Sequence, residues 1–241
     1  MLEAGLWGFV GGAALLIGAL IGIYLPVSMR LVGLVLAFGA GVLVSALSFE
    51  LTLEAYESAG AAATIIGLAA GSLTFFAGDL LIDRRGGDRR KNPEGMQAGA
   101  ASGALVLGAL LDGVPESAAI GVSLIDGGMV GVTVVAAVFL SNVPESMAAS
   151  SGMKASGKSA TYILLLWVAV TTASVVAAVL GFGLLSGAGP GLTAVVEAFA
   201  AGAILTMLAD TMLPEAVRYA GPAVGVMTVV GFACAFLLAM A

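Results

Sequence analysis

Long apolar stretches take up nearly the whole chain, and each is long enough to cross a lipid bilayer as a helix. The 241 residues are 60% hydrophobic and only 10% charged. A helix satisfies its own backbone hydrogen bonds, which lipid cannot do. We therefore predict an all-α integral membrane protein, with a single eight-helix transmembrane domain over residues 1–241. The predicted helices lie at about 5–25, 31–53, 62–82, 98–124, 129–152, 160–185, 191–217 and 222–240.

The basic residues fall on one side of the predicted membrane. With the N-terminus outside, all nine lie in cytoplasmic loops, as the positive-inside rule requires. They are Arg30, Arg84, Arg85, Arg89, Arg90, Lys91, Lys154, Lys158 and Arg218. The stretch 84–95 is interpreted as a charged topogenic loop, and the first apolar stretch as a retained helix rather than a cleaved signal peptide. The pattern predicts a multi-pass protein of the cell (inner) membrane with both termini outside.

Two near-identical hexapeptides interrupt neighbouring apolar stretches. They are Asp112-Gly-Val-Pro-Glu-Ser117 and Ser141-Asn-Val-Pro-Glu-Ser146. A carboxylate inside a membrane helix lacks water, and a proline beside it removes a backbone hydrogen bond, so each copy is doubly costly. Because the costly pattern occurs twice, a functional explanation is favoured over accident.

The spacing within the hexapeptides predicts one oxygen-rich cation site near the middle of the membrane. Asp112 and Glu116 are four residues apart and share a helix face; Ser141 and Glu145 are likewise four apart, with Asn142 close to that face. The prolines free carbonyl oxygens that could also bind an ion. These five residues are the candidate metal ligands. The alternative is that the two glutamates are protonated carboxyls that only hold neighbouring helices together.

Further acids lie toward the two ends of the predicted helices. Glu50, Glu54 and Glu57 fall toward the outer end of the second helix, and Asp210 and Glu215 toward the inner end of the seventh. They predict a cation pathway with an acidic mouth outside and acids near the inner exit. For the residues nearest the helix ends, a structural role is an equal alternative.

A second repeat relates the second and seventh helices. Residues 37–60 match residues 198–221 at a constant offset of 161, with nine identities. The copies are five helices apart in chain order, with four helices between them, so they cross the membrane in opposite directions. This predicts a 3+2+3 arrangement with inverted repeats around central helices 4 and 5, as in secondary transporters. The alternative is chance similarity of alanine-rich and glycine-rich helices.

Glycines spaced by four indicate close helix packing, with a homodimer face as the alternative.

The motifs together resemble the ZIP family of divalent-metal transporters, as a prokaryotic member with a histidine-free site. The resemblance rests on the two hexapeptides, on residues 148–159 and on the seventh-helix pattern of residues 201–215. It implies eight helices, extracellular termini, and a metal site between the fourth and fifth helices in which Glu116 and Glu145 match the family's motif glutamates. The family typically has His-Asn where this chain has Asp112-Gly113. The sixth helix carries no acid, so a second bound metal is not expected.

The candidate ligands all bind through oxygen. Such a set suits manganese, magnesium or calcium, and it lacks the imidazole that favours zinc, iron or copper. Combined with the resemblance, it predicts a divalent transition-metal ion, with manganese, iron and zinc unresolved. The ion is the transported substrate, and no cofactor is predicted. Inward direction follows from the resemblance alone, and proton exchange is left open.

Other functions use the same residues differently. A cation/proton permease for another small cation would need the same buried acids, and a transport-inactive metal sensor or assembly partner would explain the missing histidine. An enzyme is not expected, because the chain has no histidine, and its single cysteine, Cys234, lies in the last apolar stretch. Apart from the lipid bilayer and the metal ion, no partner is indicated, and nothing supports nucleic-acid binding.

Overall fold

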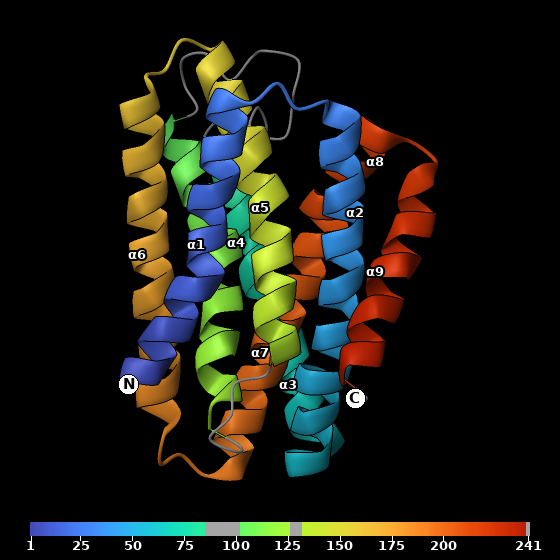
Figure 1. Cartoon of the computed structure of the whole chain (residues 1–241). Helices are drawn as coiled ribbons and strands as arrows, with labels where there is room; N and C mark the ends of the chain where they lie inside the picture. Colours follow the sequence, from blue (N-terminus) through green and yellow to red (C-terminus); the bar gives the residue numbers. More distant parts are fainter. Residues whose placement is uncertain (85–101, 126–131, 240–241) are drawn as a thin grey trace.

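The computed structural model describes residues 1–84, 102–125 and 132–239, and over these residues the chain is helical with no strand (Figure 1). Most of the predicted basic loop over residues 84–95 lies outside them. The helices are α1 (Leu2–Tyr24), α2 (Met29–Ala46), α3 (Leu53–Arg84), α4 (Ser102–Ser123), α5 (Val132–Ala155), α6 (Ala160–Leu185), α7 (Pro190–Met207), α8 (Leu213–Ala220) and α9 (Ala223–Ala239). Two wider π-helical segments, η1 (Leu47–Thr52) and η3 (Leu208–Met212), connect α2 to α3 and α7 to α8.

The helices are apolar enough for a membrane protein. Four helical stretches meet the length and hydropathy needed for a span: Leu2–Tyr24, Met29–Arg84, Ala160–Leu185 and Pro190–Ala220. Large apolar side chains on the outside are strongly exposed, among them Leu165 at 64% and Val226 at 68%. Exposed apolar surface of this kind suits contact with lipid. The prediction of an all-α chain with membrane-type helices is confirmed.

One helix end differs from its predicted place. The second predicted helix was expected to end at residue 53, yet the chain stays helical to Gly60, where φ of 77° divides α3 into two parts. Hydropathy marks where a helix leaves the hydrocarbon core and does not mark where its hydrogen bonding ends. The backbone break falls at a glycine because a positive φ is easily reached without a Cβ.

The two stretches related by the offset of 161 share local features. Gly60 and Gly221 both have positive φ, 77° and 63°. The π-helical segments η1 and η3 begin at corresponding residues, Leu47 and Leu208. In both stretches a matching glycine permits close packing on another helix's backbone: Gly41 faces α9 and Gly202 faces α3.

Most close contacts made by glycines fall within two groups of helices (Figure 1), although Gly39 of α2 also packs on Leu140 of α5. In one, α1 packs on α5 at Gly18 and on α6 at Gly8, and α4 packs on α6 at Gly121. In the other, α2 packs on α9 at Gly41, and α3 packs on α7 at Gly71. Small residues let membrane helices approach closely. We call α1, α4, α5 and α6 the first helix group, and α2, α3, α7, α8 and α9 with their π-helical segments the second helix group.

The N-terminus and the end of α9 lie at one end of the bundle, drawn at the bottom of Figure 1. At the opposite end α2 begins, and α3, α5 and α8 end. Arg30, Arg84, Lys154 and Arg218 belong to these helix ends, and Lys158 to the connection between α5 and α6. We call this the basic end of the bundle.

Candidate cation site

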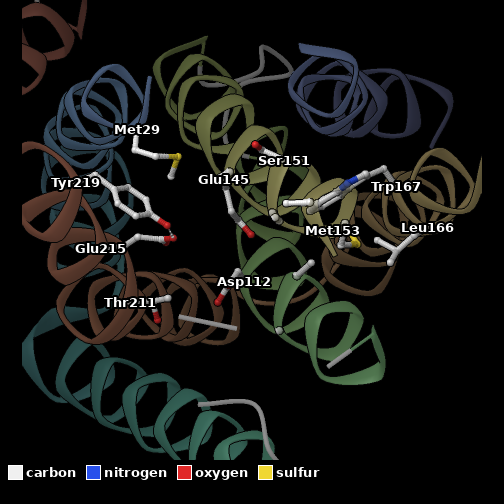
Figure 2. Close-up of a pocket in the computed structure, with 16 residues that line it drawn as sticks. Met29, Asp112, Glu145, Ser151, Met153, Leu166, Trp167, Thr211, Glu215 and Tyr219 are labelled. Atoms are coloured by element: carbon white, nitrogen blue, oxygen red, sulfur yellow. Dashed lines mark hydrogen bonds between the residues drawn. The ribbon is translucent and has the colours of Figure 1, made fainter. Parts of the chain in front are cut away.

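A cavity of about 160 Å³ lies between the two helix groups (Figure 2). Its acidic residues are Asp112 on α4, Glu145 on α5 and Glu215 on α8. It reaches the basic end, because the first residue of α2, Met29, and the last residue of α5, Ala155, also line it. Three carboxylates facing one interior cavity create a strong preference for a cation.

A smaller cavity of about 30 Å³ continues inward from the first. The two cavities share Asp112, Glu145, Thr211 and Glu215. These four residues, which we call the junction residues, therefore lie where the cavities meet. The smaller cavity adds apolar side chains, including that of Leu36 on α2.

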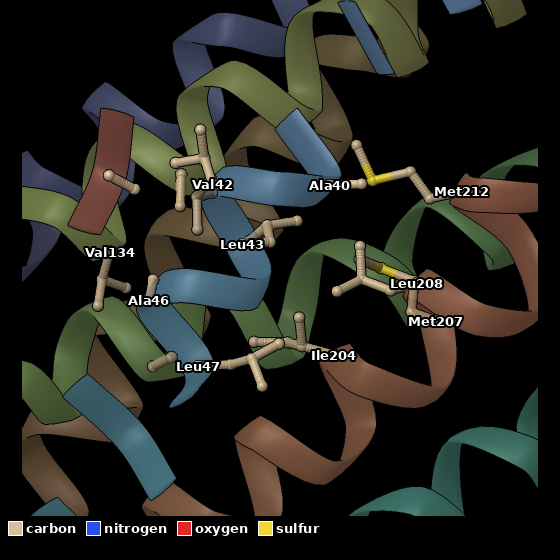
Figure 3. Close-up of a cluster of buried hydrophobic side chains, with 14 of the residues drawn as sticks. Ala40, Val42, Leu43, Ala46, Leu47, Val134, Ile204, Met207, Leu208 and Met212 are labelled. Carbon is tan, nitrogen blue, oxygen red and sulfur yellow. The ribbon is translucent and has the colours of Figure 1, made fainter. Parts of the chain in front are cut away.

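Packed apolar side chains follow the smaller cavity toward the end that holds the N-terminus. Along α2, Met29 lines the large cavity, Leu36 lines the small one, and Leu43 is buried in an apolar cluster farther on (Figure 3). From α7 and η3, Ile204 and Leu208 join the same cluster, 3% and 1% exposed. The cavities thus extend from the basic end to the interior, and beyond them tightly packed side chains exclude water.

Two of the five predicted ligands, Asp112 and Glu145, line the cavities. Each comes from one of the hexapeptides, and the prolines of both hexapeptides lie inside continuous helices. Asp112 is buried, only 7% exposed, and Glu145 is half-buried. The carbonyl of Leu140, which Pro144 was expected to free for an ion, packs against Gly39 on α2.

The other three predicted ligands lie away from both cavities. The hydroxyl of Ser141 is 3.3 Å from Oε1 of Glu116, and both residues are buried. The amide of Asn142 donates a hydrogen bond of 3.2 Å to the carbonyl of Gly11 on α1. Helical spacing specifies which residues share a face, but it does not specify that α1 packs against α5 and supplies a partner there. The metal-binding role of these three residues stays a prediction.

Of the predicted pathway acids, Glu215 reaches the cavities. Its Oε1 accepts a hydrogen bond of 2.6 Å from the hydroxyl of Tyr219, one helical turn later. The remaining four, Glu50, Glu54, Glu57 and Asp210, line neither cavity. Glu50 is half-buried in η1, and the other three are exposed.

Sequence reasoning missed three polar residues that line the large cavity, Ser151, Thr211 and Tyr219. Thr211 and Tyr219 lie four residues before and four residues after Glu215. This period-four spacing places Thr211, Glu215 and Tyr219 near one helix face and was a usable signal. Neither Thr211 nor Tyr219 belongs to one of the two hexapeptides, so the motif pattern does not single them out.

The site is not a closed metal centre as it stands. Among the residues that the structure describes, no three or more His, Cys, Asp or Glu side chains are close enough together to hold a metal ion. The junction residues instead line facing walls: Asp112 and Glu145 belong to the first helix group, while Thr211 and Glu215 belong to the second. A cation entering the cavity would meet oxygen atoms from both groups.

Comparison with protein-family models finds no match, and comparison with curated proteins finds no relative. The resemblance to ZIP transporters therefore rests on the motifs of this chain.

Proposed function

We propose that this protein is a divalent transition-metal transporter, of the manganese, iron or zinc class, related to the ZIP family. The observation that carries the proposal is the carboxylate-lined cavity between the two helix groups, to which Asp112, Glu145 and Glu215 contribute. Asp112 and Glu145 come from the two hexapeptides on which the family resemblance rests. Buried carboxylates in a membrane interior are costly unless a cation or proton uses them.

The proposed architecture is eight spans in a 3+2+3 order. The second span comprises α2, η1 and the part of α3 before Gly60; the third is the rest of α3; the seventh comprises α7, η3 and α8. The matching glycine conformations, π-helical segments and glycine contacts of the two related stretches support inverted repeats. Helices α4 and α5 are the central pair.

The proposed transport cycle moves one helix group relative to the other. By the positive-inside rule the basic end is cytoplasmic, so the cavity that reaches this end faces inward. An ion held between Asp112 and Glu145 leaves past Glu215 and Tyr219. The apolar cluster beyond the small cavity keeps the outer side closed in this conformation. Opening the outer side requires those packed side chains to separate.

Uptake of metal ions into proteoliposomes tests the proposal. Manganese, iron, zinc, cadmium and magnesium would be compared for the native chain, the double variant Asp112→Asn/Glu145→Gln, and the control Glu3→Gln, whose exposed side chain lines neither cavity and belongs to no predicted pathway. We expect selective uptake that the double variant loses, down to the level of empty vesicles, and that the control retains. Proton flux without divalent uptake would indicate a cation/proton permease instead. Binding without uptake would indicate a sensor.

A further inference from the structure

Thr211 stands out among the junction residues because it carries no charge. It lies in η3 and lines both cavities together with Asp112, Glu145 and Glu215 (Figure 2). It belongs to the second helix group, whereas Asp112 and Glu145 belong to the first. The residue is therefore placed where an ion at the junction would meet the second group.

The hydroxyl of Thr211 lacks the hydrogen bond that many other helical hydroxyls of this protein make to the backbone. Many serine and threonine side chains here donate to the carbonyl four residues earlier, as is common in membrane helices. They are Ser48, Thr64, Thr74, Ser146, Thr172, Thr206 and Thr228. In contrast, Oγ1 of Thr211 is buried and has no hydrogen-bond partner within the described part of the chain. Ser45 has the same lack, but it lines neither cavity.

The backbone around Thr211 is π-helical. In η3 a backbone hydrogen bond runs from the N–H of Leu213 to the carbonyl of Leu208, five residues earlier. Such wide turns are rare, and they occur frequently at functional sites. A buried hydroxyl without a partner costs about 1–3 kcal/mol, so its persistence in the wall of a cavity that three acidic residues also line favours a ligand that satisfies it.

We propose that Thr211 is a direct, neutral oxygen ligand of the transported cation and helps to set the choice of metal. This inference rests on the proposed function and identifies a ligand that the motif pattern does not contain. With Asp112, Glu145 and Glu215 it completes an all-oxygen set drawn from both helix groups. Hydroxyl and carboxylate oxygens favour hard ions such as Mn²⁺ over soft ions such as Cd²⁺.

Metal binding to the full-length protein in detergent tests the assignment. Binding of Mn²⁺ would be measured by the electron paramagnetic resonance signal of the free ion, and Cd²⁺ by competition. The variants are Thr211→Val, which keeps the shape and removes the oxygen, Thr211→Ser, which keeps the oxygen, and Thr211→Cys, which replaces it with sulfur. The matched control is Thr206→Val, because the hydroxyl of Thr206 already donates to the carbonyl of Gly202.

We expect Thr211→Val to weaken Mn²⁺ binding about tenfold, a typical loss for one group that supports a metal site. Thr211→Ser and Thr206→Val should bind Mn²⁺ like the native chain. Thr211→Cys should shift the Cd²⁺ to Mn²⁺ preference toward Cd²⁺ by about tenfold or more, since thiolate is a soft ligand. Native-like Mn²⁺ affinity in Thr211→Val with an unchanged metal preference in Thr211→Cys would overturn the assignment. If the native chain itself bound no divalent ion, the proposed function would fail first, and the two failures are thereby distinguished.

Discussion

Glu215 accepts a hydrogen bond from a tyrosine of its own helix. The Tyr219 hydroxyl donates to it over 2.6 Å, and the Tyr219 side chain lies close to Gly33 on α2. This contact with α2 limits where the phenol can move. The hydrogen bond therefore orients the carboxylate that faces the inner part of the cavity, in the manner of outer-shell groups that orient metal ligands.

Replacing Tyr219 with phenylalanine should weaken Mn²⁺ binding about tenfold, because the carboxylate of Glu215 loses the group that orients it. The measurement is Mn²⁺ affinity of the purified variant, with its thermal unfolding midpoint recorded alongside. Tyr162→Phe is a suitable control, since Tyr162 is exposed and lines neither cavity. Unchanged affinity in Tyr219→Phe would show that Glu215 needs no such orientation.

At the scale of single residues, the sequence predicted the acids of the site better than its neutral groups. Asp112, Glu145 and Glu215 attract attention because charge is rare in apolar stretches. Thr211 looks like any other helical hydroxyl until its missing hydrogen bond is seen. Asn142 could not be placed from sequence, because its partner is a carbonyl 131 residues away on α1.

At the scale of helices, close packing at corresponding glycines holds the second helix group together. A Cβ added at Gly41 would collide with the backbone of α9 at Thr228, and one added at Gly202 with the backbone of α3 at Leu68. Backbone atoms cannot turn aside as a flexible side chain can. The helices themselves would have to separate.

We expect Gly41→Ala and Gly202→Ala each to destabilise the fold by about 1–3 kcal/mol, the usual effect of overpacking. Gly225→Ala on α9 is the matched control, because no atom lies within 4 Å of the added carbon there. It should be neutral or slightly stabilising, since alanine is the better helix former. Thermal unfolding in detergent measures all three. Equal stability of Gly41→Ala and Gly225→Ala would contradict the packing described here.

Helix type and approximate position could be predicted from hydropathy, whereas details of hydrogen bonding could not. The second helix continues to Gly60 because its last residues readily form a helix outside the lipid as well, so hydropathy does not mark its end. The π-helical segments η1 and η3 contain no glycine or proline that would mark a change of helix type, so no local breaker distinguishes them. Their geometry depends on packing against other helices, which a single sequence does not display.

At the scale of the whole molecule, the two ends of the bundle differ in charge. The basic residues described by the structure gather at the end opposite the N-terminus. Leu25, in the connection between α1 and α2, lies at the basic end, and Ser186, just after α6, lies at the other. Both residues are exposed, so each can report on the side that it faces.

Single-cysteine variants should show that the basic end is cytoplasmic. In a Cys234→Ser background, a membrane-impermeant maleimide should label Ser186→Cys in intact cells. It should label Leu25→Cys only after the cells are permeabilised, because positive loops stay inside. The reverse labelling pattern would invert the proposed orientation and make the open cavity face outward. Labelling of both variants in intact cells would argue against a sealed transmembrane bundle.

The division of the junction residues between the two helix groups has a mechanical consequence. A cation bound there would act as a removable cross-link, holding Asp112 and Glu145 on one body to Thr211 and Glu215 on the other. While the cross-link is in place, the bodies resist sliding past each other. Once the ion departs, carboxylates of like charge face each other across the gap and push the bodies apart. If the proposed function holds, the bound ion itself would keep the two helix groups together, and the rate of transport would depend on how tightly the ion is bound.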